Sequence, residues 1–191
     1  MRLVDPETGA SALGPEYQEW LVGRAPRDER GVMVPEPGDL MLAHRNGPMS
    51  RAVTWGQKLR GYDHRLCYWS HCGIVVEDAA LVEALGRGVE RTPVSKYIDI
   101  DHRFVHTTLD PRARQRVVNF AEHAVGRQYG FTEMASMGLY LASGTRLHWA
   151  MDNQLLCSSL AAEALCRTSA IFPKEPLWML PVDLAVYYGV T

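Results

Sequence analysis

The sequence predicts an α+β domain in which an antiparallel, barrel-like sheet packs against helices. Segments with the features of strands are grouped between residues 40 and 107 of the 191-residue chain, and segments with helical spacing of apolar residues follow from Asp110 onward. Strands and helices that are grouped in this way are typical of the α+β class, since alternating units would indicate a parallel sheet. A hydrophobic fraction of 47% and a charged fraction of 22% are ordinary for a globular chain of this size.

The strands are predicted from short apolar runs bounded by turn residues. The clearest run is residues 69–77, and Glu77 and Asp78 form the corner of a hairpin with residues 80–85. The expected strands are residues 40–43, 69–77, 80–85, 89–92 and 102–107.

The helices are predicted from apolar residues three and four positions apart. The helix after Asp110 has the most complete signals, because Asp110 is a good N-cap, Pro111 suits the first helical position and Gly126 suits the end. The expected helices are residues 49–60, 111–125, 131–141 and 155–165, with a short helix or strand at 182–188.

Two domain-level regions are expected. Residues 1–34 form an N-terminal extension and linker, with a short helix near 16–22, and residues 35–191 form the main domain. The N-terminus lacks the apolar core of a signal peptide, and no apolar run approaches the roughly 18 residues that a membrane span needs. The cytoplasm is therefore the default location, although export by another route or incorporation in a larger particle stays open. A net charge of −2 gives no reason to expect nucleic acid as a partner.

Cys157 is the first candidate for chemistry. Apolar and small residues recur after it with helical spacing, and the polar residues Asp152, Asn153 and Gln154 precede it as candidate caps. Cys157 then lies in the first helical turn, where the macrodipole favours the reactive thiolate. The alternative is a small buried residue at the junction of helix and core, since free Cys is among the most buried residue types.

His71 and Glu83 are candidate partners of that thiol. Both interrupt apolar strands, where an unpaired polar group is costly to bury. If the hairpin turn lies near residues 77–78, the two side chains are cross-strand or diagonal neighbours, whereas a register shifted by one residue would put them on opposite faces. A thiol nucleophile needs an imidazole to take its proton and a third polar group to orient the imidazole. The sequence therefore predicts a Cys157–His71–Glu83 constellation.

Two other clusters carry alternatives. His64, Cys67, His71 and Cys72 lie within nine residues and suggest zinc, but their spacing lacks a second ligand pair and His71 and Cys72 point to opposite faces of a strand. Arg103 is either a ligand for a substrate carboxylate or phosphate, or a solvated charge at the end of a strand. We expect no metal and no cofactor.

Five short motifs in a fixed order resemble the circularly permuted NlpC/P60 superfamily of papain-like cysteine hydrolases, in its YiiX/YebB-like branch. The motifs are Gly38-Asp39-Leu40, Ser70-His71-Cys72-Gly73-Ile74-Val75, Val82-Glu83-Ala84, Gly126-Arg127-Gln128-Tyr129-Gly130 and Leu156-Cys157-Ser158-Ser159-Leu160. The resemblance implies a permuted papain-like fold in which the His strand precedes the Cys helix.

The resemblance also implies roles. Cys157 would be the nucleophile, His71 the general base and Glu83 the residue that orients it. Tyr129 would line the pocket near the cysteine, with Ser158 beside it, and Asp39 would be structural.

The expected function is that of a cysteine hydrolase which cleaves an amide bond, peptide or isopeptide-like, through a thioester acyl-enzyme. The substrate class would be a peptide, a peptidoglycan-like molecule or a lipid amide. A lipid-acting acyltransferase or phospholipase of the same fold, with an acyl channel along residues 134–141, and a catalytically silent binding module are the alternatives.

Overall fold

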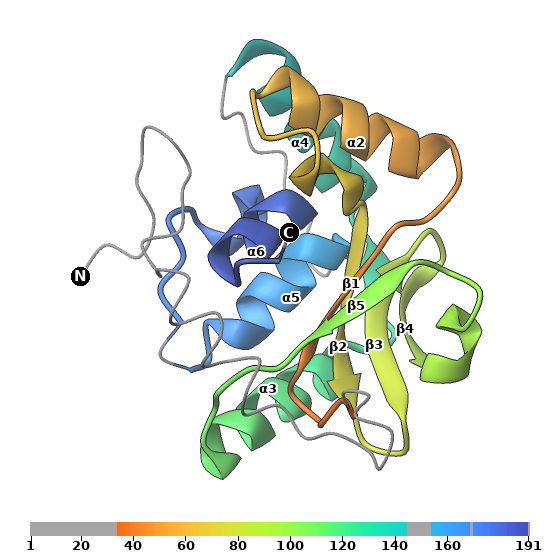
Figure 1. The fold of residues 1–191 in the computed structure, drawn as a ribbon, viewed down its shortest axis with the longest axis vertical. Helices are drawn as coiled ribbons and strands as arrows, with labels where there is room; N and C mark the ends of the chain where they lie inside the picture. Colours follow the sequence, from red (N-terminus) through yellow and green to blue (C-terminus); the bar gives the residue numbers. More distant parts are fainter. Residues whose placement is uncertain (1–33, 145–153, 169, 191) are drawn as a thin grey trace.

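The computed structural model describes residues 34–144, 154–168 and 170–190. Its centre is a five-stranded antiparallel sheet with the strand order β4-β3-β2-β1-β5 (Figure 1). The strands are β1 (Leu40–Ala43), β2 (His71–Val76), β3 (Ala80–Leu85), β4 (Gly88–Pro93) and β5 (His102–Val105). The predicted strands are therefore confirmed, with small changes at their ends.

The described helices are α2 (Pro48–Leu59), α3 (Pro111–Ala124), α4 (Phe131–Ser143), α5 (Cys157–Leu165) and α6 (Pro181–Tyr187). Short 3-10 turns occur at η1 (Leu66–Tyr68), η2 (Val94–Tyr97) and η3 (Pro176–Trp178). Asp110 caps α3 as predicted, because its carboxylate accepts a hydrogen bond of 2.9 Å from the Ala113 amide. The segment 182–188, which the sequence left open between helix and strand, is largely helix α6.

Helices α3 and α5 pack on one face of the sheet, against β2, and the main core lies between them (Figure 1). That core includes Leu42 and Ile74 from the sheet, Val117 from α3 and Leu160 from α5. All six residues of β2 are buried, since α3 and α5 cover one face and η2 covers part of the other. A continuous apolar run is the sequence pattern of a strand buried on both faces.

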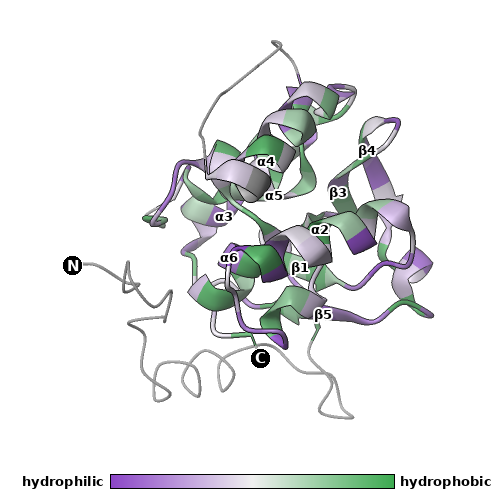
Figure 2. Cartoon of the chain, turned by 90° about the horizontal axis from the view of Figure 1, so that it is seen from above, coloured by the Kyte–Doolittle hydropathy of each residue, from purple (hydrophilic) through white to green (hydrophobic). Residues whose placement is uncertain are grey.

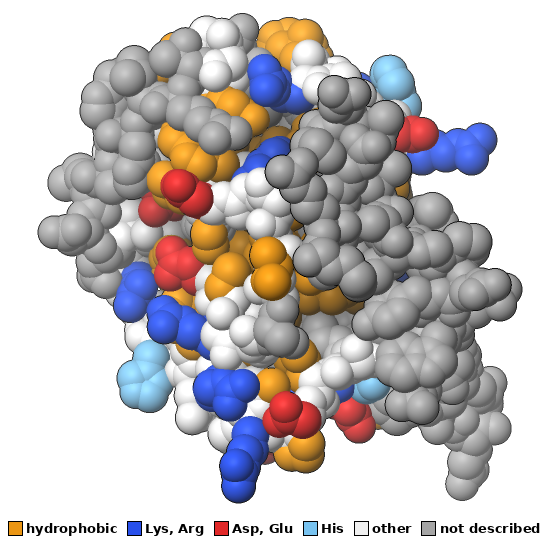
Figure 3. Space-filling model, turned by 90° about the vertical axis from the view of Figure 1, so that its left-hand side faces the viewer, with side chains coloured by type: hydrophobic (Ala, Val, Ile, Leu, Met, Phe, Trp, Pro, Cys, Tyr) orange, Lys and Arg blue, Asp and Glu red, His pale blue; other side chains and the backbone are white. Residues whose placement is uncertain are grey.

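A second cluster joins α4, η3 and α6 at the end of the domain where α2 lies. Figure 2 shows hydrophobic residues along α4 and α6, and Figure 3 shows hydrophobic side chains that reach the surface with Lys and Arg around them. Gln57 of α2 is fully buried and bonds to three backbone groups: its amide nitrogen donates to the carbonyls of Cys67 and Trp69, and its oxygen accepts from the Val182 amide. These bonds fix α2 against η1 and α6.

Asp39 has the structural role that the sequence predicted. Its fully buried carboxylate accepts hydrogen bonds from the Thr107 amide at 3.0 Å and from the Arg114 guanidinium at 2.9 Å. These bonds connect the start of β1 with the end of β5 and with α3.

The sheet is open in the described part of the chain, because β4 and β5 lie at opposite edges, so the expected barrel-like closure is not seen there. The N-terminal extension and its short helix lie outside the described residues, apart from Val34. No helix in the described ranges is long and apolar enough to cross a membrane.

Candidate active site

Cys157 lies in the first turn of α5, as predicted, and begins that helix; the residue is partly exposed, whereas Ser158 and Ser159 behind it are buried. The prediction that a polar residue at 152–154 caps this helix is wrong. The N-cap is Leu156, in an extended conformation, and Gln154 belongs to β7 (Gln154–Leu155), which pairs in parallel with β6 (Gln128–Tyr129). Asp152 and Asn153 lie outside the described residues.

Glu133 and Ser159 hold the start of α5 instead. The Leu156 amide donates to Glu133 Oε2 at 3.2 Å and to Ser159 Oγ at 2.9 Å, and the Ser159 hydroxyl lies 3.2 Å from the same carboxylate oxygen. Glu133 comes from the first turn of α4 and is buried, and this burial raises its pKa. Sequence reasoning missed Glu133, because its partner is 23 residues away in the chain.

His71 and Glu83 meet as the hairpin predicted. The register pairs Ile74 with Val82, which places Gly73 opposite Glu83 and His71 on the diagonal. His71 Nε2 lies 2.5 Å from Glu83 Oε2, and both side chains are buried. Gly73 makes this contact sterically feasible: a Cβ atom at that position would lie 3.2 Å from the Cβ of Glu83. Glycine inside a strand often marks such a close approach.

Two further groups from η2 hold Glu83. The Tyr97 hydroxyl donates a hydrogen bond to Glu83 Oε2, and Lys96 Nζ lies 4.0 Å from Glu83 Oε1. The Tyr97 ring is nearly parallel to the His71 ring, with 6.5 Å between centroids. Burial acts to raise the pKa of Glu83, but the bonds from His71 and Tyr97 lower it to about 2, so this carboxylate is ionised at neutral pH.

The thiol and the imidazole are charged together. A hydrogen bond from the Cys72 thiol and the positive charge of His71 hold the pKa of Cys157 well below its ordinary value, although burial opposes them. Burial acts to lower the pKa of His71, but the Cys157 thiolate and the Glu83 carboxylate raise it to about 9. The lowered pKa of Cys157 and the raised pKa of His71 therefore both favour a thiolate–imidazolium pair. His71 Nε2 bonds to Glu83, so Nδ1 is the ring nitrogen left for Cys157.

Cys72 is a neighbour that sequence reasoning did not assign to the site. It is fully buried on β2, and burial together with its hydrogen bond to Cys157 raises its pKa well above the ordinary value. Cys72 therefore keeps its proton and donates a hydrogen bond to the Cys157 thiolate.

Of the predicted substrate-binding residues, two lie beside the thiol. Tyr129 is half-buried on β6, and its pKa is raised by burial and by the negative charge of Cys157. Ser158 follows Cys157 in α5 and is buried. Arg103 lies elsewhere: it is exposed on the edge strand β5, β1 separates it from β2, and it lines a different pocket together with Tyr68 and other residues.

The zinc alternative finds no support in the described residues. No group of three or more His, Cys, Asp or Glu side chains there is placed to share a metal ion. His64 is exposed, Cys67 is buried with its thiol 3.6 Å from the Tyr62 carbonyl, and His71 bonds to Glu83.

The fold is similar to that of a solved protein, the metalloprotein yiiX from Escherichia coli O157:H7 (DUF1105). The TM-score is 0.52, the identity is 19%, and the alignment covers 82% of this chain and 84% of that one. The chain therefore has a YiiX-like α+β fold, which agrees with the branch that the motifs indicated. No family model matches the sequence, and no curated protein matches it.

Proposed function

We propose that the protein is a cysteine hydrolase with a permuted papain-like fold, in which Cys157 is the nucleophile, His71 the general base and acid, and Glu83 the residue that orients His71. The observation that carries this proposal is the position of a partly exposed cysteine at a helix start, beside the buried His71–Glu83 pair with its 2.5 Å contact. The pKa of the cysteine thiol is lowered and that of the neighbouring imidazole is raised. A thiolate at neutral pH is the reactive form of cysteine.

The proposed reaction is acyl transfer from an amide. The thiolate attacks the carbonyl carbon, and the backbone N–H groups at the start of α5 stabilise the oxyanion. The C–N bond then breaks, His71 gives its proton to the leaving amine, and a thioester on Cys157 remains. In the second half, His71 takes a proton from water, the hydroxide attacks the thioester carbon, and the C–S bond breaks to release the carboxylic acid and restore the thiolate.

Glu83 supports both halves without touching the substrate. It holds the Nε2 side of His71, which directs Nδ1 at the sulfur and stabilises the imidazolium. Tyr97 acts indirectly by donating a hydrogen bond to Glu83, and Glu133 does so by accepting one from the Leu156 amide at the start of α5.

The lipid-acting alternative loses one of its supports. The acyl channel expected along residues 134–141 would need its side chains free, but Met137 and Tyr140 are 6% and 5% exposed and pack against Trp178 and Leu180 in the second core cluster. An experiment that compares amide, ester and thioester substrates identifies the bond that is cleaved.

The test uses one acyl group presented as an amide, an ester and a thioester. We expect mass spectrometry to find a covalent acyl adduct on Cys157 and turnover of the amide, and we expect neither with Cys157→Ala. Turnover of the ester or thioester alone would replace the amidase assignment with an esterase or acyltransferase. Absence of any adduct on Cys157 from all three substrates would overturn the hydrolase proposal and favour a binding module.

A further inference from the structure

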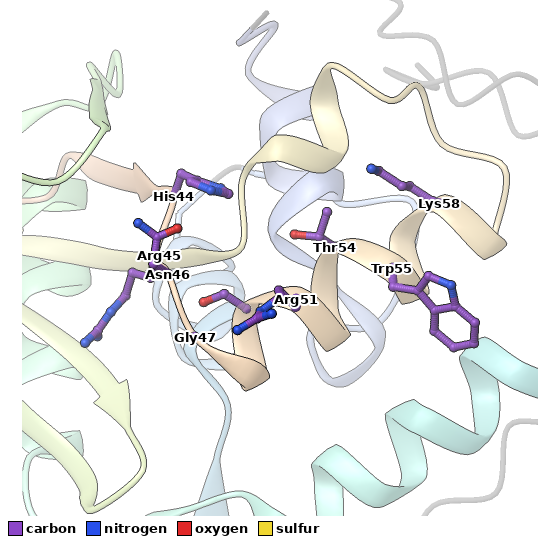
Figure 4. Close-up of a pocket in the computed structure, with 9 residues that line it drawn as sticks. His44, Arg45, Asn46, Gly47, Arg51, Thr54, Trp55 and Lys58 are labelled. Carbon is purple, nitrogen blue, oxygen red and sulfur yellow. The ribbon is translucent and has the colours of Figure 1, made fainter.

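A cavity of about 360 Å³ lies between residues 44–47, which follow β1, and helix α2 (Figure 4). Its lining includes three cationic side chains and no acidic one. The cations are Arg45, Arg51 and Lys58. This excess of positive charge is local, because the whole chain has a net charge of −2.

The three cations have no acidic partner among the described residues. The ion pairs that the described residues form involve other Lys and Arg side chains, such as Lys96, Arg114 and Lys174. Arg45 is the most informative of the three, because it is half-buried. A guanidinium that is partly removed from water without a carboxylate partner is costly to hold, and an anionic ligand would offset that cost.

Polar groups and an aromatic ring complete the lining. Asn46, Ser50 and Thr54 supply neutral hydrogen-bonding groups, and the Trp55 indole is 64% exposed at the rim. Figure 4 shows the Arg51 side chain extending from α2 toward residues 44–47. The guanidinium of Arg51 and the ammonium of Lys58 on α2, with the neutral polar groups of residues 44–47 opposite them, match the oxygens of a carboxylate or a phosphate.

The cavity adjoins the candidate active site through the end of β1. Ala43 pairs with His71 across the sheet, and the Arg45 amide donates to the hydroxyl of Ser70, the residue before His71, at 3.2 Å. The charge of Arg45 also reaches Tyr97 and Tyr129: burial raises the pKa of both hydroxyls, and the Arg45 cation opposes that rise. Arg45 therefore lies between the cavity and the groups around Cys157 and His71.

We propose that this cavity is an anion-binding subsite which holds a carboxylate or phosphate group of the substrate while its acyl carbon lies at Cys157. The placement of the acyl carbon at Cys157 rests on the hydrolase function proposed above. The binding of an anion in the cavity does not depend on that function. Arg51 and Lys58 of α2 contact the anionic oxygens, and Arg45 connects the anion with the catalytic groups. Substrates with a negative charge near the scissile bond are then preferred over their neutral analogues.

The first experiment measures anion binding by titration calorimetry, with inorganic phosphate and with the carboxylate of an N-acetylated dipeptide. The double variant Arg51→Gln/Lys58→Gln changes only exposed side chains, and Arg112→Gln on the exposed surface of α3 is the matched control. We expect at least one anion to bind, with affinity about tenfold or more weaker in the double variant and unchanged in the control. The arm that binds more tightly identifies phosphate or carboxylate as the natural group. No binding of either anion, or equal affinity in the double variant, would overturn the subsite.

The second experiment links the cavity to Cys157 by comparing alkylation with iodoacetate and with iodoacetamide, which differ in charge and little in size. We expect the rate constant for iodoacetate divided by that for iodoacetamide to be lower in Arg45→Gln than in the wild type. We also expect inorganic phosphate to slow the reaction with iodoacetate but not the reaction with iodoacetamide. Anion binding in the first experiment with an unchanged ratio here would refute the connection to Cys157. Binding is measured in Cys157→Ala as well, so that a failure of the hydrolase proposal leaves the result for the cavity readable.

Discussion

Removal of the His71 imidazole should return Cys157 toward an ordinary thiol, and the size of the effect follows from the charges around His71. The pKa of His71 rises from 6.5 to about 9, and each pKa unit corresponds to about 1.4 kcal/mol. The imidazolium therefore has a net stabilisation of about 3 kcal/mol, which remains after burial has opposed the attraction of the Cys157 thiolate and the Glu83 carboxylate. Because this interaction is mutual, His71→Ala should raise the pKa of Cys157 by about one unit or more.

The assay is the rate of Cys157 alkylation by iodoacetamide between pH 5 and 9. An ordinary thiol with a pKa near 8.5 is about 0.3% thiolate at pH 6 and about 10% at pH 7.5, so its rate rises about thirtyfold over that interval. We expect the wild-type rate to change much less with pH over that interval, because the lowered pKa of Cys157 forms the thiolate at a lower pH. The shape of the profile is the useful quantity, since a thiolate of lower pKa is also a weaker nucleophile. In His71→Ala the rate should rise with pH, by about threefold or more between pH 6 and 7.5.

Two controls make the assay specific. Cys157→Ala reports labelling at other positions, and Cys166→Ala removes a thiol that is exposed at the other end of α5. An ordinary profile in the wild type would refute the ion pair itself. A flat profile that persists in His71→Ala would show that Cys72 and the helix start, rather than the imidazole, stabilise the thiolate.

Three further predictions concern the residues around the pair. Glu83→Gln should lower the free energy of unfolding by about 3 kcal/mol at pH 7, because one partner of a buried ion pair is lost. The wild type should also lose stability as the pH falls from about 4.5 to about 2. The pKa of the native Glu83 carboxylate is lowered, so this group binds its proton at a lower pH than the carboxylate of the unfolded chain. Urea titrations should show a smaller dependence of stability on pH in the variant. Glu133→Ala should cost about 1–3 kcal/mol and slow alkylation of the thiol, whereas Glu133→Gln, which keeps an acceptor for the Leu156 amide, should retain most of both. Gly73→Ala should destabilise the domain by about 1–3 kcal/mol, because the new methyl group meets Glu83; thermal unfolding at the wild-type level would contradict this.

The parts of the fold that were predicted from sequence are those with a local signal. The strand β2 has a continuous apolar run, α3 has a cap at Asp110 and a glycine beyond its end, and the hairpin turn follows from Glu77 and Asp78. The pairing of His71 with Glu83 followed from the same signals, since the length of the turn decides which residues lie on the diagonal. The open edge of the sheet had no such signal, because barrel closure depends on contacts between distant strands.

The missed residues belong to contacts across the fold. Glu133 and Ser159 replace the expected cap of α5, and Tyr97 reaches Glu83 from a 3-10 turn that had no hydrophobic period. Cys72 contributes to the site because α5 packs on β2. Arg103, which the sequence left open between a substrate ligand and a solvated charge, lies on the edge strand β5, because the sequence indicates that it belongs to a strand but not which neighbours that strand has.

The pH dependence of stability cannot replace the alkylation profile as evidence for the ion pair. Between about pH 6.5 and 8.5 the unfolded chain carries one proton on the pair, at the thiol, and the native protein also carries one, at His71. The raised pKa of His71 alone makes stability fall with rising pH in this window, and the lowered pKa of Cys157 alone makes it rise. Because the two slopes cancel, the pair transfers a proton on folding without changing the number bound, and the free energy of unfolding is flat. Only a probe that reacts with the sulfur itself reports where that proton is.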